Sequence, residues 1–394
     1  TSYPVAWRIR APSMDADLVF EPLVDDQELL FFDMTATVWE GAGKVSGSIG
    51  GRRVSGRARG EFYGYGLVAD SGEFLNRFTR SIQGHLESFL PRAIGSEQME
   101  RFLGETRWSY DRMAYDRTIA EPVWDLIDRR GKCWRPAFVL LMLEALGRES
   151  KPYEALLALS VELAHTGALI VDDVEDNSLI RRGDTSIHLR YGTDVAINAG
   201  STLYFLPMLL IDEHPLLSDE QKLALHSIAM RHFTRAHLGQ ALDIYLARNV
   251  ARELEAGSGG ESLRGKIKQM YALKTATAVM GAAESAAIIA ESGAALTAEA
   301  VAFARDFGVA FQIIDDVLNF SDSPRWRKTC GEDLHEGKLT YVIYRAIELL
   351  DKPGVERLTA ILCSEELRHE DSIRAEGVEL IRKSGAVNAA TVEA

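Results

Sequence analysis

A group of carboxylates directly follows an apolar run in the stretch HTGALIVDDVEDNSLIRRGDTSIH (165–188). On a helix, Asp172, Asp173 and Asp176 share one face because the first two precede the third by four and three residues. Like charges at this spacing repel, and more strongly if the run ALIV carries the helix into a core. Oxygen ligands without cysteine favour a hard cation such as Mg²⁺, which shares its coordination shell with phosphates. The cluster predicts a magnesium site, and a solvated acidic helix end is the alternative.

A second cluster of the same form occurs in FQIIDDVLNF (311–320), where Asp315, Asp316 and Asn319 follow another apolar helical run. Two such clusters on separate helices can hold several divalent ions around one diphosphate from opposite walls of a cavity. Asn319 fits this pattern because its side-chain carbonyl is a neutral oxygen ligand.

Basic side chains accompany both acidic clusters. Lys132 and Arg135 are three residues apart in GKCWRP (131–136), on a turn that enters a helix, and this spacing suits the binding of one phosphate group. Further basic candidates are Arg181, Arg182, Lys274, Lys328 and Lys338. Each one alone is more often a solvated charge. Together they predict two anion sites, one bridged by metal and one bound by cationic side chains only.

The hydrophobic periodicity divides the chain at about residue 70. Residues 1–70 alternate apolar and polar residues, which predicts strands over VAWRIR, DADLVFEPL, ELLFFDMTATVWEG, KVSGSI and VSGRARGEFYGYG. Gly50 and Gly51 predict a hairpin between the last two. Residues 71–394 show a helical period with short breaks, and Pro91 ends the first helix. We therefore expect a mainly α protein, an all-α helical bundle preceded by a small β segment.

Composition limits the classes of partner. The formal net charge is −14, which argues against broad electrostatic binding to nucleic acid or anionic lipid, although local basic sites can form. Cys133, Cys330 and Cys363 are far apart and lack metal-ligand spacing, which is typical of structural thiols in a reducing cytosol. Glu144 and Pro207 interrupt the long apolar runs. We therefore expect a cytoplasmic protein without a membrane-spanning helix or a signal peptide.

From residue 72 to 383 the chain resembles the trans-prenyl diphosphate synthases, and within them most closely the geranylgeranyl diphosphate synthases. The motifs, in the order typical of the family, are GKCWRP, DDVED with RRGDTSIH, HLGQALDIY, LKTAT, FQIIDDVLNF and GEDLHEGKLT. The resemblance implies an isoprenoid synthase bundle, a homodimer and about three Mg²⁺ ions per active site, with Mn²⁺ as an alternative. Cys133, Trp134, Thr185 and Tyr341 depart from the usual motifs without removing a ligand.

The resemblance also implies roles for individual residues. The implied metal ligands are Asp172, Asp173, Asp176, Asp315, Asp316 and Asn319. Isopentenyl diphosphate would be held by Lys132, Arg135, His165 and Arg182. The allylic diphosphate would be contacted by Arg181, Lys274, Thr275, Gln240, Lys328 and Lys338. The residues expected to act in catalysis are Asp172, Asp173, Asp176, Gln240, Lys274 and Asp315. Asp243 would support the metal site or the reacting centre.

Small residues before the first acidic cluster suggest space for a hydrocarbon chain. Ala164, Gly167 and Ala168 lie on the helix below Asp172, where they leave a lane for a growing product, with close helix packing as the alternative. Tyr204, Phe205 and His237 match positions that form the pocket floor in geranylgeranyl diphosphate synthases. We therefore expect a C20 product.

The β segment carries a second, more limited resemblance. VWEGAGKVSG and ARGEFYGYG resemble the C-terminal part of the lipocalin-like domain of carotenoid 1,2-hydratases. The alternative is a docking or dimer-contact module without chemistry. We expect two domains, a partial lipocalin-like β segment over 1–70 and a prenyl diphosphate synthase domain over 71–394.

Two other functions compete with chain elongation. A class I terpene cyclase would need the metal clusters but not the predicted isopentenyl diphosphate grip. A non-catalytic regulatory subunit would be expected to have lost carboxylates that this chain keeps. If the protein elongates prenyl chains, we expect its substrates to be isopentenyl diphosphate and an allylic prenyl diphosphate, and we expect no nucleic-acid partner.

Overall fold

The structure is a computed structural model, and it describes residues 6–24, 28–31, 36–63, 71–105, 107–129, 131, 133–256, 261–321 and 330–394. The chain forms two compact units, Thr1–Ser81 and Ile82–Ala394. The division falls inside the first helix, about a dozen residues beyond the expected boundary at residue 70.

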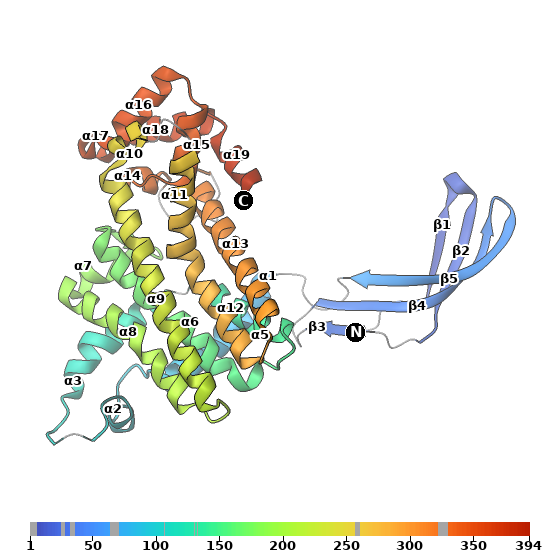
Figure 1. Cartoon of the computed structure of the whole chain (residues 1–394), viewed down its shortest axis with the longest axis horizontal. Helices are drawn as coiled ribbons and strands as arrows, with labels where there is room; N and C mark the ends of the chain where they lie inside the picture. Colours follow the sequence, from blue (N-terminus) through green and yellow to red (C-terminus); the bar gives the residue numbers. More distant parts are fainter. Residues whose placement is uncertain are drawn as a thin grey trace. The chain divides into compact units, whose positions relative to one another are not determined.

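The first unit contains an antiparallel sheet, shown in blue in Figure 1. Its strands are β1 (Trp7–Ala11), β2 (Ala16–Pro22), β3 (Glu28–Phe31), β4 (Ala36–Ile49) and β5 (Arg52–Tyr63). The order is β1-β2-β4-β3, and β5 pairs with β4. Gly50 and Gly51 form the expected hairpin turn, with φ of +57° and +72°, the combination required by a type I′ turn.

Two strand boundaries differ from the prediction. The sequence predicts one strand over ELLFFDMTATVWEG, but β3 ends at Phe31 and pairs antiparallel with β4, which begins at Ala36. The sequence predicts separate strands on either side of Gly43, but β4 runs without a break from residue 36 to 49. A side chain at Gly43 would overlap the ring of Phe20, and one at Gly60 would overlap Phe20 and Trp7. The ring of Phe20 is 2% exposed and stacks on Trp7 with the centroids 5.0 Å apart. These glycines therefore make room for an aromatic pair and do not end the strand.

The second unit is a helical bundle, which confirms the predicted fold class. Its first helices are α1 (Ser71–Phe89), α2 (Ser96–Leu103), α3 (Arg112–Tyr115), α4 (Glu121–Asp128), α5 (Trp134–Ala145), α6 (Glu154–Glu175), α7 (Ile187–Tyr191), α8 (Thr193–Glu213), α9 (Asp219–Arg248) and α10 (Val250–Ala256). The remaining helices are α11 (Glu261–Tyr271), α12 (Thr277–Ile289), α13 (Ala294–Asn319), α14 (Glu332–Glu336), α15 (Tyr341–Leu349), α16 (Lys352–Cys363), α17 (Glu365–His369), α18 (Asp371–Lys383) and α19 (Ala386–Glu393).

Two π-helical turns interrupt this series, η2 (Asp116–Ala120) before α4 and η4 (Ala272–Ala276) between α11 and α12. A short hairpin of β6 (Ile180–Arg181) and β7 (Asp184–Thr185) follows α6, where the sequence predicted only helix and loop. Both kinds of local feature lie next to motifs that the sequence analysis singled out.

The long helices pack around one another in the middle of the bundle. Helix α6 packs against α8 and α5, and α12 packs against α13, α9 and α5. Helices α14 to α19 gather at one end of the bundle in Figure 1. A capping box between Ser218 and Gln221 fixes the start of α9. These contacts bring the C-terminal end of α6 to the middle of α9 and to η4.

Glycines allow α6 and α8 to approach closely. A Cβ atom at Gly167 would collide with the carbonyl oxygen of Gly200 and would lie 2.9 Å from Cβ of Leu203. One at Gly200 would lie 2.8 Å from the side chain of Val171. Gly167 therefore serves close helix packing, the alternative to the predicted hydrocarbon lane.

Two segments of the bundle meet the length and composition of a membrane span, Lys151–Glu175 and Thr193–Glu213. The sequence predicts no membrane-spanning helix, and these two segments are candidates by length and composition only. The segments include α6 and α8, whose apolar faces pack against each other and against other helices. Burial within a bundle selects the same apolar composition as a bilayer does.

We predict that Gly167→Ala destabilises the protein by about 1–3 kcal/mol, because the added methyl group pushes α6 and α8 apart. Urea-induced unfolding followed by far-UV circular dichroism measures the loss. The control is Gly84→Ala in α1, where nothing lies within 4 Å of the added atom. It should leave stability unchanged or raise it by up to about 1 kcal/mol. Equal stability of the Gly167 and Gly84 variants would contradict the packing role.

Candidate active site

The first acidic cluster lies at the C-terminal end of α6, where the helix dipole makes negative charge unfavourable. Positive side chains from distant segments compensate for it. Lys274 Nζ lies 3.1 Å from Asp172 Oδ1, and Lys338 Nζ lies 2.6 Å from Asp176 Oδ2. The amide of Gln240 also donates to Asp172 Oδ1 at 2.9 Å. The structure therefore brings together two predicted metal ligands and three residues predicted to contact the allylic diphosphate.

The two lysine-bound carboxylates differ in protonation. Burial favours the neutral form of Asp172, but Lys274, Lys338 and Arg181 outweigh burial and hold its pKa well below the usual value. Burial has the larger effect on Asp176 and raises its pKa to about 6, in spite of Lys338. The negative charge of Asp172 contributes to this rise. Asp172 is thus the permanent anion of the pair.

Asp173 belongs to a different set of contacts. Its side chain is fully buried, and Oδ1 accepts from Arg181 Nε at 2.7 Å. Arg181 in turn begins a two-residue turn between β6 and β7, in which Arg182 and Gly183 have φ of +53° and +82°. Asp173 was predicted as a metal ligand and Arg181 as an allylic diphosphate contact, but here they bind each other. The other oxygen of Asp173 has no hydrogen-bond partner among the residues that the structure describes.

The π-helical turn η4 positions Lys274. Its Nζ lies 2.6 Å from Asp243 Oδ2 of α9 as well as near Asp172. A Cβ atom at Gly239 would lie 2.7 Å from the backbone of Leu273, so glycine at this position lets η4 reach α9. The motifs HLGQALDIY and LKTAT therefore meet because α9 has no side chain where they touch.

The second cluster is held by hydrogen bonds. Asp316 is buried and accepts from the Tyr271 hydroxyl, from the Gln312 amide at 3.0 Å and from the backbone N–H of Tyr341 at 3.3 Å. Burial raises its pKa to about 7, although the bonds from Tyr271 and Gln312 favour the charged form. Thr275, predicted to contact the allylic diphosphate, donates to Gln312 at 2.7 Å.

Asn319 does not serve as a free ligand in this structure. Its side chain is 2% exposed, and Oδ1 accepts from the backbone N–H of Asp333 at 3.4 Å. Its own carbonyl oxygen accepts from the N–H of Gly331 at 3.0 Å. Asn319 therefore links α13 to the start of α14, and this link explains why an amide side chain stands at this position. Asp315, one turn earlier, is half-buried.

The predicted grip for isopentenyl diphosphate is also assembled. Arg135 Nη1 lies 3.2 Å from His165 Nε2, and its guanidinium lies over the Trp134 ring, 4.4 Å from the centroid. Arg182 donates to the carbonyl oxygen of Leu126 at 3.1 Å and is influenced electrostatically by the same buried acid, Glu162, as Arg135. Lys132 and Lys328, the other predicted phosphate contacts, lie outside the described residues.

Burial sets the protonation of this second site. It lowers the pKa of Arg135 to about 10 and, together with Arg135 and Arg182, lowers the pKa of His165 well below its usual value. Glu162 is also buried, and its pKa is raised in spite of both arginines. At neutral pH the site therefore has two guanidinium ions and a neutral imidazole.

The predicted chain-length residues are only partly brought together. Tyr204 packs edge-on to His237 with the ring centroids 5.5 Å apart, and burial raises its pKa to about 12. Phe205 is 63% exposed within this chain. Ala164 is half-buried and Ala168 is exposed, while α8 fills the space next to Gly167. Tyr204 and His237 fit the predicted floor, whereas Phe205 could form part of it only if another molecule covered it.

The side-chain oxygen atoms of the first acidic cluster are suitable ligands for a divalent metal ion. Within the described ranges no three His, Cys, Asp or Glu side chains converge to hold one ion. The carboxylate oxygens of Asp172 and Asp176 instead contact ammonium groups, which are themselves cations. Asp173 Oδ2 and Gln240 Oε1 are buried acceptors without hydrogen-bond partners. The cluster therefore has more oxygen acceptors than hydrogen-bond donors to satisfy them. Hard oxygen atoms of this kind are the ligands that Mg²⁺ or Mn²⁺ prefers.

Sequence reasoning missed several groups that hold this site. Gln312 precedes Asp316 by four residues, so helical spacing could have found it. The roles of Tyr271 and Glu162 could not be recognised from the sequence, because each interacts with residues that are distant along the chain. Glu336 lies 2.7 Å from Lys338, two residues along the chain.

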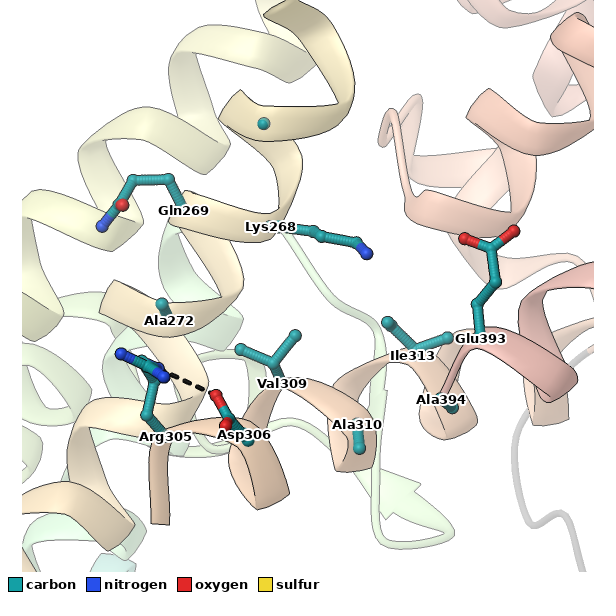
Figure 2. Close-up of a pocket in the computed structure, with 11 residues that line it drawn as sticks. Lys268, Gln269, Ala272, Arg305, Asp306, Val309, Ala310, Ile313, Glu393 and Ala394 are labelled. Carbon is teal, nitrogen blue, oxygen red and sulfur yellow. Dashed lines mark hydrogen bonds and ion pairs between the residues drawn. The ribbon is translucent and has the colours of Figure 1, made fainter. Parts of the chain in front are cut away.

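A cavity of about 510 Å³ lies elsewhere, between α11, α13 and the last residues of the chain (Figure 2). Its charged lining residues are Lys268, Arg305, Asp306 and Glu393. Arg305 and Asp306 pair at 2.8 Å, and the two basic and two acidic side chains balance. Such a lining has no excess positive charge for a diphosphate, and none of the predicted site residues belongs to it.

Known proteins share the bundle and its motifs. The polyprenyl synthetase family matches residues 116–378. A short chain isoprenyl diphosphate synthase of Methanothermobacter thermautotrophicus is 31% identical over 66% of this chain and 75% of its own length. Solanesyl-diphosphate synthase 2 of Oryza sativa subsp. japonica is 30% identical over 66% of this chain and 60% of its own length. A geranylgeranyl diphosphate synthase of Methanosarcina mazei is 30% identical over 57% and 65%, respectively.

Solved structures agree in fold. Geranylgeranyl pyrophosphate synthase from Corynebacterium glutamicum, in complex with isoprenyl diphosphate and magnesium, superposes with a TM-score of 0.64 at 23% identity, covering 80% of this chain and 88% of that one. Polyprenyl synthase from Caulobacter crescentus gives a TM-score of 0.63 at 22% identity, covering 82% and 88%. The fold is that of the all-α isoprenoid synthases. With the family match over two acidic clusters and their basic partners, the chain belongs to the polyprenyl synthetase family.

We predict that Asp173→Asn and Asp176→Asn differ in their effect on stability. Asp173→Asn removes the nearest counter-charge of buried Arg181, which keeps the more distant Asp172 at 3.7 Å, and should cost about 3–5 kcal/mol. Asp176→Asn should cost less than about 1 kcal/mol, because burial already disfavours its charge and Lys338 keeps Glu336. Urea unfolding in EDTA measures both, and equal losses would show that the two carboxylates are not in different environments.

Proposed function

We propose that the chain joins isopentenyl diphosphate head to tail to an allylic diphosphate, giving a trans prenyl diphosphate of 20 carbons. The observation that carries this proposal is that two separate groups of charged side chains meet on one helix. His165 and Asp172 are seven residues, two turns, apart on α6, so they point from the same face about 10 Å apart along the axis. One site has carboxylates with lysines, and the other has arginines with a neutral histidine.

The two sites suit the two substrates. Asp172 and Asp176 would hold Mg²⁺, which when bound supplies positive charge to the diphosphate of the allylic substrate. Lys274 and Lys338 stabilise the negative charge on that diphosphate as its C–O bond breaks. Arg135, Arg182 and His165 hold isopentenyl diphosphate two turns away. Its alkene then bonds to the allylic carbon, and a proton leaves to the departed diphosphate.

A second molecule is part of the proposal. Phe205 of α8 is 63% exposed, and Ile197 and Leu238 are 46% and 59% exposed. Apolar surface of this kind is typical of an interface between subunits. We propose a cytoplasmic homodimer in which the second chain covers Phe205, so that this ring joins Tyr204 and His237 at the pocket floor.

One assay separates this activity from its rivals. The protein is incubated with Mg²⁺, dimethylallyl diphosphate and labelled isopentenyl diphosphate. An elongated diphosphate supports the proposal, a cyclic hydrocarbon indicates a terpene cyclase, and absence of product indicates a regulatory subunit. EDTA should abolish elongation, since Asp172 and Asp176 would then have no metal ion to supply charge to the allylic diphosphate.

We predict that Arg182→Ala raises KM for isopentenyl diphosphate by about 10- to 100-fold, the value of a charge-assisted hydrogen bond. KM for the allylic substrate should change little because Lys274 and Lys338 hold that diphosphate. Steady-state kinetics with each substrate varied in turn measures both constants. The control is Arg190→Ala, whose partners Asp125 and Asp184 are not among the predicted substrate contacts. A rise in the allylic KM alone would contradict the assignment.

We also predict that Tyr204→Ala lengthens the product beyond C20, because the ring that packs against His237 is removed. Chromatography of the dephosphorylated products measures chain length. Phe205→Ala should lengthen the product only if the protein is a dimer, so its molar mass is measured by light scattering at the same time. A C20 product from both variants would refute the floor.

A further inference from the structure

One face of the β sheet in the first unit is basic. Strand pairing places Arg8 and Arg10 of β1 on the same face as Lys44 of β4, because Arg10 is opposite Asp17 and Asp17 is opposite Ser48. The pairing of Lys44 with Arg57 extends this face to β5. The basic residues of this surface, here called the basic face, are Arg8, Arg10, Lys44, Arg53, Arg57 and Arg59, and all are exposed.

Few acids oppose these charges. Asp17 pairs with Arg8 at 2.6 Å and approaches Arg10 at 3.6 Å, and Glu21 is opposite Lys44 in register. Among its described side chains the basic face therefore has six that are positive and two that are negative. Within the described residues Lys44, Arg53 and Arg57 form no ion pair.

The hairpin end also presents apolar side chains. The turn between β1 and β2 exposes 62% of Met14, and the neighbouring hairpin exposes 37% of Ile49. The N–H of Gly50 donates to the carbonyl oxygen of Asp15 at 3.0 Å, which ties the two turns together. Met14 thus lies at the same edge as Arg10 and Arg53, whereas Ile49, which follows Ser48 on β4, points to the opposite face of the sheet. An apolar tip beside basic side chains suits the interface of a membrane, where a Met side chain enters the headgroup layer.

Local charge outweighs net charge at such a surface. The chain as a whole has a net charge of −14, which disfavours anionic partners at long range. At physiological ionic strength the screening length is about 8 Å, so a flat anionic surface responds mainly to the side chains that touch it.

We propose that the basic face docks on the surface of an anionic lipid bilayer, with Met14 entering the headgroups. A bilayer fits better than nucleic acid, because the described side chains of this face include no aromatic ring for stacking on bases. It also fits better than a protein. Apart from Val19, the residues between the basic side chains are small, Ala42, Ser46, Ser48 and Ser55, and they supply few apolar contacts for an anchoring side chain. The binding does not depend on the proposed enzymatic activity.

Vesicle sedimentation tests the proposal with the full chain. Vesicles of phosphatidylcholine with phosphatidylglycerol should bind the protein, and vesicles of phosphatidylcholine alone should not. A basic residue near an anionic leaflet raises partitioning about fivefold, so Arg53→Ser with Arg57→Ser should reduce binding about 25-fold. The matched control is Arg248→Ser with Arg252→Ser on exposed positions of the bundle, which changes the net charge equally. Circular dichroism confirms that both variants are folded.

Every result of these binding measurements either supports or overturns docking of the basic face on a bilayer. Loss of binding in the basic-face variant, with the control unchanged and with release by 0.5 M salt (roughly a 4 Å screening length), supports the proposal. Equal binding of both variants, equal binding to neutral vesicles, or no binding to either vesicle overturns it. A change of molar mass by light scattering in the basic-face variant alone, without any vesicle effect, would identify a second copy of the chain as the partner and would also overturn it.

Discussion

The contact between two lysines and the carboxylates at the end of α6 joins the separate parts of the bundle. Lys274 comes from η4 and Lys338 from the segment after α14, and both reach Asp172 or Asp176. Two unit charges 4 Å apart interact by about 4 kcal/mol at the effective dielectric of a protein, so these carboxylates could not remain together without cations. The same carboxylates are needed to attract metal and diphosphate. The lysines therefore make a charge-dense site compatible with a folded chain before any ligand binds.

Helical spacing was sufficient to predict the elements of this site that lie on one face of one helix. Asp172 and Asp176 follow from the sequence because their separation corresponds to about one turn of helix, whereas the role of His165 came only from the family resemblance. Helical spacing could not show that Asp173 turns away to Arg181, because that contact depends on the β6–β7 hairpin. The bond from the Tyr341 N–H to Asp316 was also beyond prediction, since a backbone donor leaves no signature in the side-chain pattern.

Glycines were the least predictable residues, because several different structural roles require a residue without a side chain. Gly50 was predicted as a turn and forms one, whereas Gly43 was predicted to end a strand and instead accommodates Phe20. Gly167 was interpreted as space for a product, but it is filled by α8. Only the partner across the contact distinguishes these cases. The two faces of the sheet could be derived from alternation, but which strands would be neighbours depended on the register.

The π-helical turn η4 makes chain length as important as composition in this part of the protein. A π turn contains one residue more than the α-helix it interrupts, and each residue rotates a helix by about 100°. Deleting one residue from Ala272–Ala276 would let α11 continue regularly into α12, but it would carry Lys274 around the helix and away from α9. A chemically mild deletion would then be as severe as loss of the lysine. Natural variants of this segment should therefore differ by substitution and not in length.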